Sequence, residues 1–126
     1  MGLEGACWRA YSYLHNLTFI FKNLVNSPPQ GTYTAGETDD QYIVKDGVII
    51  SKIKFGIFQD RDVYRLCSMK IYEGETLLKE ARNLPSITFP EQGEQSIEIA
   101  PTEQIVSAKV HFFKAIPTAV QFMVYN

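Results

Sequence analysis

The chain of 126 residues has very little cysteine, which limits how covalent bonds can stabilise its fold. Its two cysteines, Cys7 and Cys67, are far apart and form no CxxC pair. Two cysteines cannot build the disulfide framework typical of small secreted proteins, so the sequence predicts two buried thiols in a reducing compartment. A single long-range disulfide is the alternative.

Long hydrophobic runs are also missing. No run reaches the roughly 18 apolar residues of a membrane-spanning helix. The N-terminus has no basic region, continuous apolar region or small-residue cleavage site of the kind found in secretory signals. We therefore expect an intracellular protein without a membrane span.

Positive charge is not in excess. Lysine and arginine total 12 against 14 aspartates and glutamates, for a formal net charge of −2 at pH 7. Surfaces that bind nucleic acid normally carry a basic patch, so the sequence predicts no nucleic-acid binding. An apolar fraction of 45% with 21% charged residues is typical of one globular domain.

Catalytic and metal-binding motifs are absent as well. The sequence contains no G-x-S-x-G elbow, no H-E-x-x-H pair and no glycine-rich phosphate loop. Its two histidines, His15 and His111, do not lie close enough to each other or to the cysteines to resemble a zinc site. The sequence therefore predicts a protein that is not an enzyme and that holds neither metal nor cofactor.

The N-terminal segment shows a different pattern from the rest of the chain. Apolar residues recur there at spacings of three and four, which predicts one stripe of a helix over residues 1–26, ended by Pro28 and Pro29. A strand over Leu17–Phe21 is the competing interpretation, because aromatic and β-branched residues are enriched there. The residues of the stripe are Trp8, Tyr11, Leu14, Leu17, Phe21 and Leu24.

Two roles are open for this stripe. It packs against the chain's own sheet, or it docks into a groove of a partner protein as a set of interface anchors. We divide the chain into an N-terminal arm, 1–27, and a β-rich domain, 28–126. A loop rich in proline, glycine and acidic residues, 28–40, connects them.

The acidic residues at the end of this loop are Glu37, Asp39 and Asp40. They do not follow the D-x-[DN]-x-[DN]-G order of a calcium-binding loop. We therefore expect a solvated acidic loop instead of a metal site.

The clearest strand signal runs from Gln41 to Phe58. Two apolar, β-branched runs lie on either side of Asp46-Gly47, a pair typical of a type I′ hairpin turn. Beyond it, Ile53, Phe55 and Ile57 alternate with lysines, which indicates a strand with one buried face.

Further strands are expected along the remaining chain. Pro85 and Pro90 bracket a short strand, 86–89, which would lie at a sheet edge or strand end. The segment 77–84 fits either a short strand or one helical turn. The expected strands are 63–72, 86–89, 96–100, 103–113 and 119–125, with turns or loops at 59–62, 73–75, 91–95 and 116–118. The fold class is therefore all-β, an antiparallel sandwich or β-prism-like domain preceded by a short helical arm.

The second half of the chain resembles the jacalin-like β-prism lectins. GVIISKIKFGIF followed by VYRLCSMKIYEG is similar to their paired strands. SIEIAPTEQIVSAKVHFFKAIPTAVQFMVYN is similar to their later strands, with Glu103 and Ile105 at matching positions. The resemblance covers residues 47–126 and implies a β-prism. It does not extend to the C-terminal G-x-x-x-D loop with which those lectins bind sugar, so it implies an inherited fold without that sugar site.

Three hypotheses follow from these observations. The first is a non-catalytic interaction module, a small accessory subunit that binds a protein partner through the six stripe residues. The alternative is a carbohydrate-binding, lectin-like domain whose partner is a glycan. The third is an enzyme whose site is assembled from dispersed acids and His111.

Overall fold

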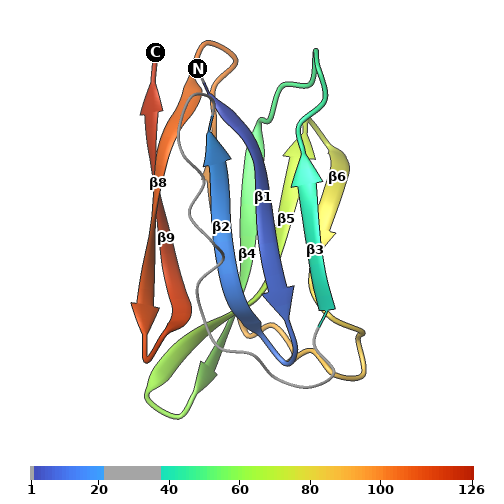
Figure 1. Cartoon of the computed structure of the whole chain (residues 1–126), viewed down its shortest axis with the longest axis vertical. Helices are drawn as coiled ribbons and strands as arrows, with labels where there is room; N and C mark the ends of the chain where they lie inside the picture. The colour runs from blue at the N-terminus through green and yellow to red at the C-terminus, as the bar shows by residue number, and fades with distance from the viewer. Residues whose placement is uncertain (1, 22–37) are drawn as a thin grey trace.

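The computed structural model describes residues 2–21 and 38–126, and this part of the chain is built from β-strands joined by turns and loops (Figure 1). Among these residues, no helix is long and apolar enough to cross a membrane. The strands are β1 (Leu3–Ala10), β2 (Leu14–Phe21), β3 (Thr38–Ile43), β4 (Lys52–Asp60), β5 (Val63–Glu73), β6 (Thr76–Ala81), β7 (Gly93–Glu98), β8 (Gln104–Phe113) and β9 (Ile116–Tyr125).

The described strands form antiparallel sheets with the orders β2-β1-β3, β6-β5-β4-β7 and β8-β9. In Figure 1 the first sheet faces the viewer, the second lies behind it, and the β8–β9 ribbon stands along one side. The inner faces of all three sheets meet in one core. Its buried members are Ala6, Trp8, Ala10, Leu14, Leu17, Phe21, Ile53, Phe55, Leu66, Met69, Ile71, Ala81, Ile99, Ile105 and Val120.

Strand β4 shows how the sequence pattern produces this arrangement. Ile53 and Phe55 are completely buried, whereas Lys52 and Lys54 point to the other face. Successive side chains of a strand alternate between faces, so the apolar set must face the core. The strand predicted here and the one after it, β5, are confirmed.

The helix predicted over residues 1–26 is wrong. Residues 3–10 and 14–21 form β1 and β2, which pair as a hairpin with Trp8 opposite Leu17. The competing prediction of a strand over Leu17–Phe21 is confirmed. The spacings of three and four combine apolar positions from two different strands, which are separated by the turn at residues 11–13. They therefore do not mark one face of a helix.

The predicted hairpin at Asp46-Gly47 is also wrong, although a turn is present. Lys45 accepts a hydrogen bond from the Val48 amide at 3.1 Å. Only Gly47 has a positive φ, 85°, whereas a type I′ turn requires positive φ at both central residues. The turn joins two sheets, because β3 pairs with β1 and β4 pairs with β5 and β7.

Other differences concern short segments. For the segment 77–84 the strand interpretation is confirmed, since residues 77–81 belong to β6, whereas the predicted strand 86–89 is wrong because most of it lies in a turn. The loop predicted over 91–95 contains the start of β7, whose Gly93–Glu98 pairs with β4. The loop predicted over 28–40 ends earlier than expected, since β3 begins at Thr38.

The turn between β8 and β9 differs from the prediction too. It consists of Lys114 and Ala115, and Pro117 is already inside β9. Both turn residues have positive φ, 51° and 66°, which is the type I′ geometry that normally selects asparagine and glycine. The sequence offered no such signal, because neither lysine nor alanine is typical of that turn.

Ala115→Gly is therefore expected to stabilise the protein by about 1 kcal/mol, since it relieves the left-handed strain of an L-residue. The measurement is urea denaturation followed by circular dichroism. Ala119→Gly, within strand β9 and outside the turn, is the matched control and should destabilise by about 0.5–1 kcal/mol. A loss of stability in Ala115→Gly as large as that in the control would contradict the assigned turn.

Candidate functional site

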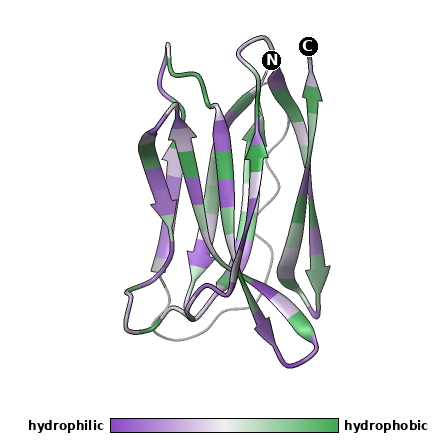
Figure 2. Cartoon of the chain, turned by 180° about the vertical axis from the view of Figure 1, so that it is seen from behind, coloured by the Kyte–Doolittle hydropathy of each residue, from purple (hydrophilic) through white to green (hydrophobic). Residues whose placement is uncertain are grey.

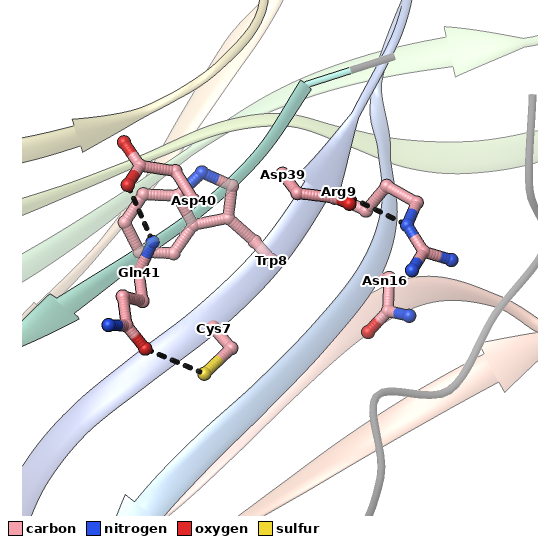
Figure 3. A pocket seen from close by; sticks show the side chains of 7 residues that line it. All are labelled: Cys7, Trp8, Arg9, Asn16, Asp39, Asp40 and Gln41. Atoms are coloured by element: carbon pink, nitrogen blue, oxygen red, sulfur yellow. Dashed lines mark hydrogen bonds and ion pairs between the residues drawn. The ribbon is translucent and has the colours of Figure 1, made fainter. Parts of the chain in front are cut away.

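An open pocket of about 410 Å³ lies over the first sheet, where β1 is flanked by β2 and β3 (Figure 3). The chain builds it from three separate segments. Its lining residues in the described part of the chain are Cys7, Trp8, Arg9, Asn16, Asp39, Asp40 and Gln41.

Strand register places the polar members of this set side by side. Because β1 is the central strand, Arg9 lies opposite Asn16 of β2 and also opposite Asp39 of β3. Cys7 lies opposite Gln41 in the same way. Cys7 and Arg9 are two residues apart, so they share one face of the sheet, while Ala6 and Ala10 on the opposite face are in the core.

The charges around the pocket are paired. Arg9 Nε donates to Asp39 Oδ1 at 2.7 Å, and Lys79 Nζ lies 2.8 Å from Asp40 Oδ2. The hydrogen bond from Lys79, together with that from the Gln41 amide, holds the pKa of Asp40 below its usual range. Two carboxylates face two cations, so the pocket presents polar groups without a net charge.

Asn16 forms a polar part of the pocket wall. The residue is only 1% exposed, and neither its amide nitrogen nor its amide oxygen has a hydrogen-bond partner. Nearly all buried polar side chains in native proteins are hydrogen-bonded, and an unsatisfied buried group costs about 1–3 kcal/mol. In Figure 3 the Asn16 amide lies close to the Arg9 guanidinium, on the polar side of the sheet.

A second open pocket, of about 540 Å³, shares Trp8, Asp39 and Asp40 with the first. Its remaining lining residues are Glu80, Arg82, Asn83, Leu84 and Pro85. The first residues of β3 therefore border two adjoining pockets. Of the residues shared by the two pockets, Asp39 and Asp40 have exposed carboxylates. Their side chains are 65% and 50% accessible, respectively.

The β1–β2 turn, residues 11–13, lies next to these pockets and is held by two hydrogen bonds from the segment 82–92. Asn83 Nδ2 donates to the Ala10 carbonyl at 3.0 Å, and the Phe89 amide donates to the Ser12 carbonyl at 2.8 Å. These contacts fix one end of the hairpin that carries Arg9 and Asn16.

An aromatic cluster packs under this turn. The rings of Tyr13 and His15 stack at 4.5 Å, and the Arg65 guanidinium lies 4.9 Å from the Tyr13 ring centre. Burial lowers the pKa of His15, and the positive charges of Arg65 and Arg9 lower it further. His15 is therefore a neutral packing residue at pH 7.

The two cysteines are free, so the disulfide alternative is wrong. Cys67 is buried, as predicted, and burial raises the pKa of its thiol to about 11. Cys7 is only half-buried, with its thiol 3.9 Å from the Gln41 side-chain oxygen, and burial raises its pKa as well. Both thiols are protonated at neutral pH.

The predicted interface anchors lie mostly in the core. Trp8, Leu14, Leu17 and Phe21 are buried inside this chain, which favours the interpretation that the stripe packs on its own sheet. Tyr11 is half-buried beside His15. Leu24, the sixth anchor, and the boundary at residue 27 lie outside the described residues.

The other residues singled out in the sequence lie apart from one another. His111 is on β8, where its Nε2 is 3.1 Å from the Gln121 side-chain oxygen. Asp39 and Asp40 belong to strand β3 and not to a solvated loop, and Glu37 is outside the described residues. No cluster of metal-ligating side chains occurs within residues 2–21 and 38–126.

Sequence reasoning missed Arg9, Asn16 and Gln41 as members of a site. The helical interpretation placed Arg9 and Asn16 seven residues apart along one helix instead of opposite each other across a hairpin. The signal that would have found Arg9 is the alternation of Ala6, Trp8 and Ala10 with Cys7 and Arg9 on the first arm, which is the period of a strand. The second arm, with His15 and Asn16 adjacent, carries no such signal.

No protein-family model and no curated protein sequence matches this chain. Among solved structures, the fold is similar to that of frutalin from Artocarpus incisa, crystallised in complex with galactose. The TM-score is 0.75 and the identity 8%, over 100% of this chain and 93% of frutalin. The chain therefore has an all-β fold similar to a β-prism lectin, as the sequence resemblance predicted.

The lowered pKa of His15 predicts an acid-sensitive fold. Since the unfolded chain takes up this proton more readily than the folded chain, stability should fall as the pH drops from about 7 through about 6.5, the ordinary histidine pKa, toward the lower folded value. His15→Gln should remove this part of the pH dependence, measured as the urea midpoint between pH 7.5 and 5.

The matched control is His111→Gln, which removes the chain's other histidine and should retain the parent's pH dependence in this range. If the urea midpoint falls equally steeply with pH in the parent and in His15→Gln, then His15 does not contribute to the loss of stability in acid.

Proposed function

We propose that this chain is a non-catalytic carbohydrate-binding domain that holds a neutral sugar in the pocket between β1, β2 and β3. The observation that carries the proposal is the set of polar side chains gathered there, on a fold similar to that of frutalin, which was crystallised with galactose. Likeness of fold alone does not transfer function, so the argument rests on the chemistry of the pocket.

Hydrogen-bonding capacity supports a sugar as ligand. Each sugar hydroxyl both donates and accepts, so it is bound best where donors and acceptors are interleaved. The pocket offers guanidinium donors from Arg9, carboxylate acceptors from Asp39, and an amide that both donates and accepts from Gln41. The exposed groups of Asp39 and Gln41 are accessible to a ligand, and Asn16 lies deeper in the wall.

Charge supports a neutral ligand. A phosphate site would leave a cation unpaired, but Arg9 is engaged by Asp39 and Lys79 by Asp40. A cationic ligand would in turn require a carboxylate without its own cation. A polyol needs neither, because it exchanges hydrogen bonds with both partners of an ion pair.

Size is consistent with one or two sugar rings. A volume of about 410 Å³ lies in the lower part of the range of small-molecule sites. The adjoining pocket of about 540 Å³ extends the surface along the other side of β3, where Asn83 and Arg82 add polar groups. Open pockets bury only part of a ligand, so we expect weak binding of a single sugar, with a Kd of about 1 mM.

The protein-partner hypothesis is a second candidate and stays a prediction. Four of its six anchors are buried in the core, so in this fold a partner would have to use other residues. The predictions that the chain is not an enzyme and that it is intracellular also stay predictions.

The test is titration of the labelled protein with galactose, mannose and glucose, followed by NMR chemical-shift changes of its amides. We expect saturable shifts in β1, β2 and β3 for at least one sugar. Asp39→Ala should weaken binding about tenfold or more, while its surface ion pair contributes at most about 1 kcal/mol to stability.

Asn16→Leu gives a second, sharper readout. It replaces an unsatisfied buried amide with an apolar group of similar size, so it should raise the melting temperature, while sugar binding through the exposed groups of Asp39 and Gln41 is retained. Glu98→Ala is the control, because Glu98 lines a pocket formed with Ser51 and Glu103 and not the pocket at β1.

Absence of shifts with every sugar at tens of millimolar would refute carbohydrate binding. Loss of binding in Glu98→Ala, with Asp39→Ala unaffected, would place the sugar elsewhere on the molecule and contradict the assigned pocket.

A further inference from the structure

The β8–β9 sheet is the narrowest in the described part of the chain. The other two sheets contain three and four strands, but here β8 and β9 pair only with each other. Each of the two strands therefore has one edge whose backbone N–H and C=O groups meet no neighbouring strand among residues 2–21 and 38–126. Such edges are templates for pairing with another strand, and native proteins usually protect them with charged side chains.

Most edge strands of this protein carry that protection. Strand β3 has Asp39 and Asp40, β6 has Lys79 and Glu80, β7 has Glu94 and Glu98, and β8 has Lys109. Strands β2 and β9 contain no aspartate, glutamate, lysine or arginine.

Burial distinguishes the two unprotected strands. In β2, residues 14–17 are all buried, so its first half is covered by the rest of the chain. The last half of β9 is the opposite case, because Gln121, Met123, Val124 and Tyr125 are all exposed. The unprotected and accessible edge is therefore the C-terminal half of β9.

Large apolar side chains gather on the same ribbon. Figure 2 shows green, apolar residues along much of β8 and β9 up to the C-terminus. Half of the exposed large hydrophobic residues of the described chain lie on these two strands. They are Phe112, Phe113, Met123, Val124 and Tyr125, with Met123 63% and Tyr125 72% accessible.

We propose that two copies of this chain associate through antiparallel pairing of their β9 strands, which makes one four-stranded sheet with the order β8-β9-β9-β8. A two-fold axis places a strand beside its own copy, so any charge near the axis would face a like charge. Strand β9 has no charge to repel its copy, and this favours a second copy over a partner of complementary charge.

One face of the β8–β9 ribbon packs on the core through Ile105 and Val120, and pairing would widen the ribbon to the four strands of the β6-β5-β4-β7 sheet. Pairing would bring Met123 and Tyr125 of the two copies together and cover apolar surface that is otherwise exposed to water. The interface is separate from the pocket at β1, so the inference does not depend on sugar binding.

The experiment is sedimentation velocity of the full chain from about 1 µM to about 1 mM, at low and high salt. We expect a shift from 14.3 kDa to twice that mass as concentration rises. The shift should depend little on salt, because uncharged strands make the interface.

Met123→Lys puts two ammonium groups near the axis and should raise the dimer dissociation constant at least tenfold. Leu77→Lys is the matched control, since Leu77 is 45% exposed on the edge strand β6, outside the proposed interface. Its dimerisation should equal that of the parent.

Hydrogen exchange of the parent supplies a readout that does not depend on the folding of any variant. Amides of residues 119–125 should exchange more slowly at 1 mM than at 1 µM, and those of 93–98 on the protected edge strand β7 should not change. A monomer at every concentration, an equal effect of Leu77→Lys, protection in β7 instead of β9, or growth beyond the dimer would each overturn the proposal.

Discussion

The structure depends on one constraint, the burial of a single apolar core that no sheet could complete alone. Strand β1 contributes Ala6 and Trp8, β4 contributes Phe55, and β9 contributes Val120. The aromatic contacts cross between sheets in the same way, since Phe122 of β9 packs against Phe19 of β2 and Phe55 of β4. Because the apolar faces must all point inward, the polar residues of each strand are left on the outer faces.

The candidate site is a consequence of that division. Trp8 is 4% exposed, so it faces the core, and its neighbours Cys7 and Arg9 must face the other way. The central position of β1 then gives Arg9 two polar neighbours, one from each adjacent strand. A site of mixed donors and acceptors with paired charges follows from strand register, without any sequence motif.

Sequence periodicity predicted β4, β5, β8 and β9 well because each is nine to eleven residues long, so the strand pattern remains recognisable despite the register shifts in their ladders. It failed over residues 3–21, where two short strands and a tight turn produced spacings that mimic a helix. It also failed at Asp46-Gly47, since a turn signal describes the local backbone and not the strands that pair on either side. The β8–β9 turn could not be recognised from the sequence, because the pairing of the two strands imposes positive φ on Lys114 and Ala115, which are not typical residues of such a turn.

By itself, the sequence determined that residues 41–126 are β-rich, that two cysteines cannot build a disulfide framework, and that the later strands alternate as in a β-prism. These properties depend on local side-chain preference and on composition. The tertiary structure alone decided which strands pair, and therefore that Arg9, Asn16 and Asp39 share one pocket and that β9 is an uncharged edge. Strand pairing is set by long-range burial of apolar surface, which no local window of sequence contains.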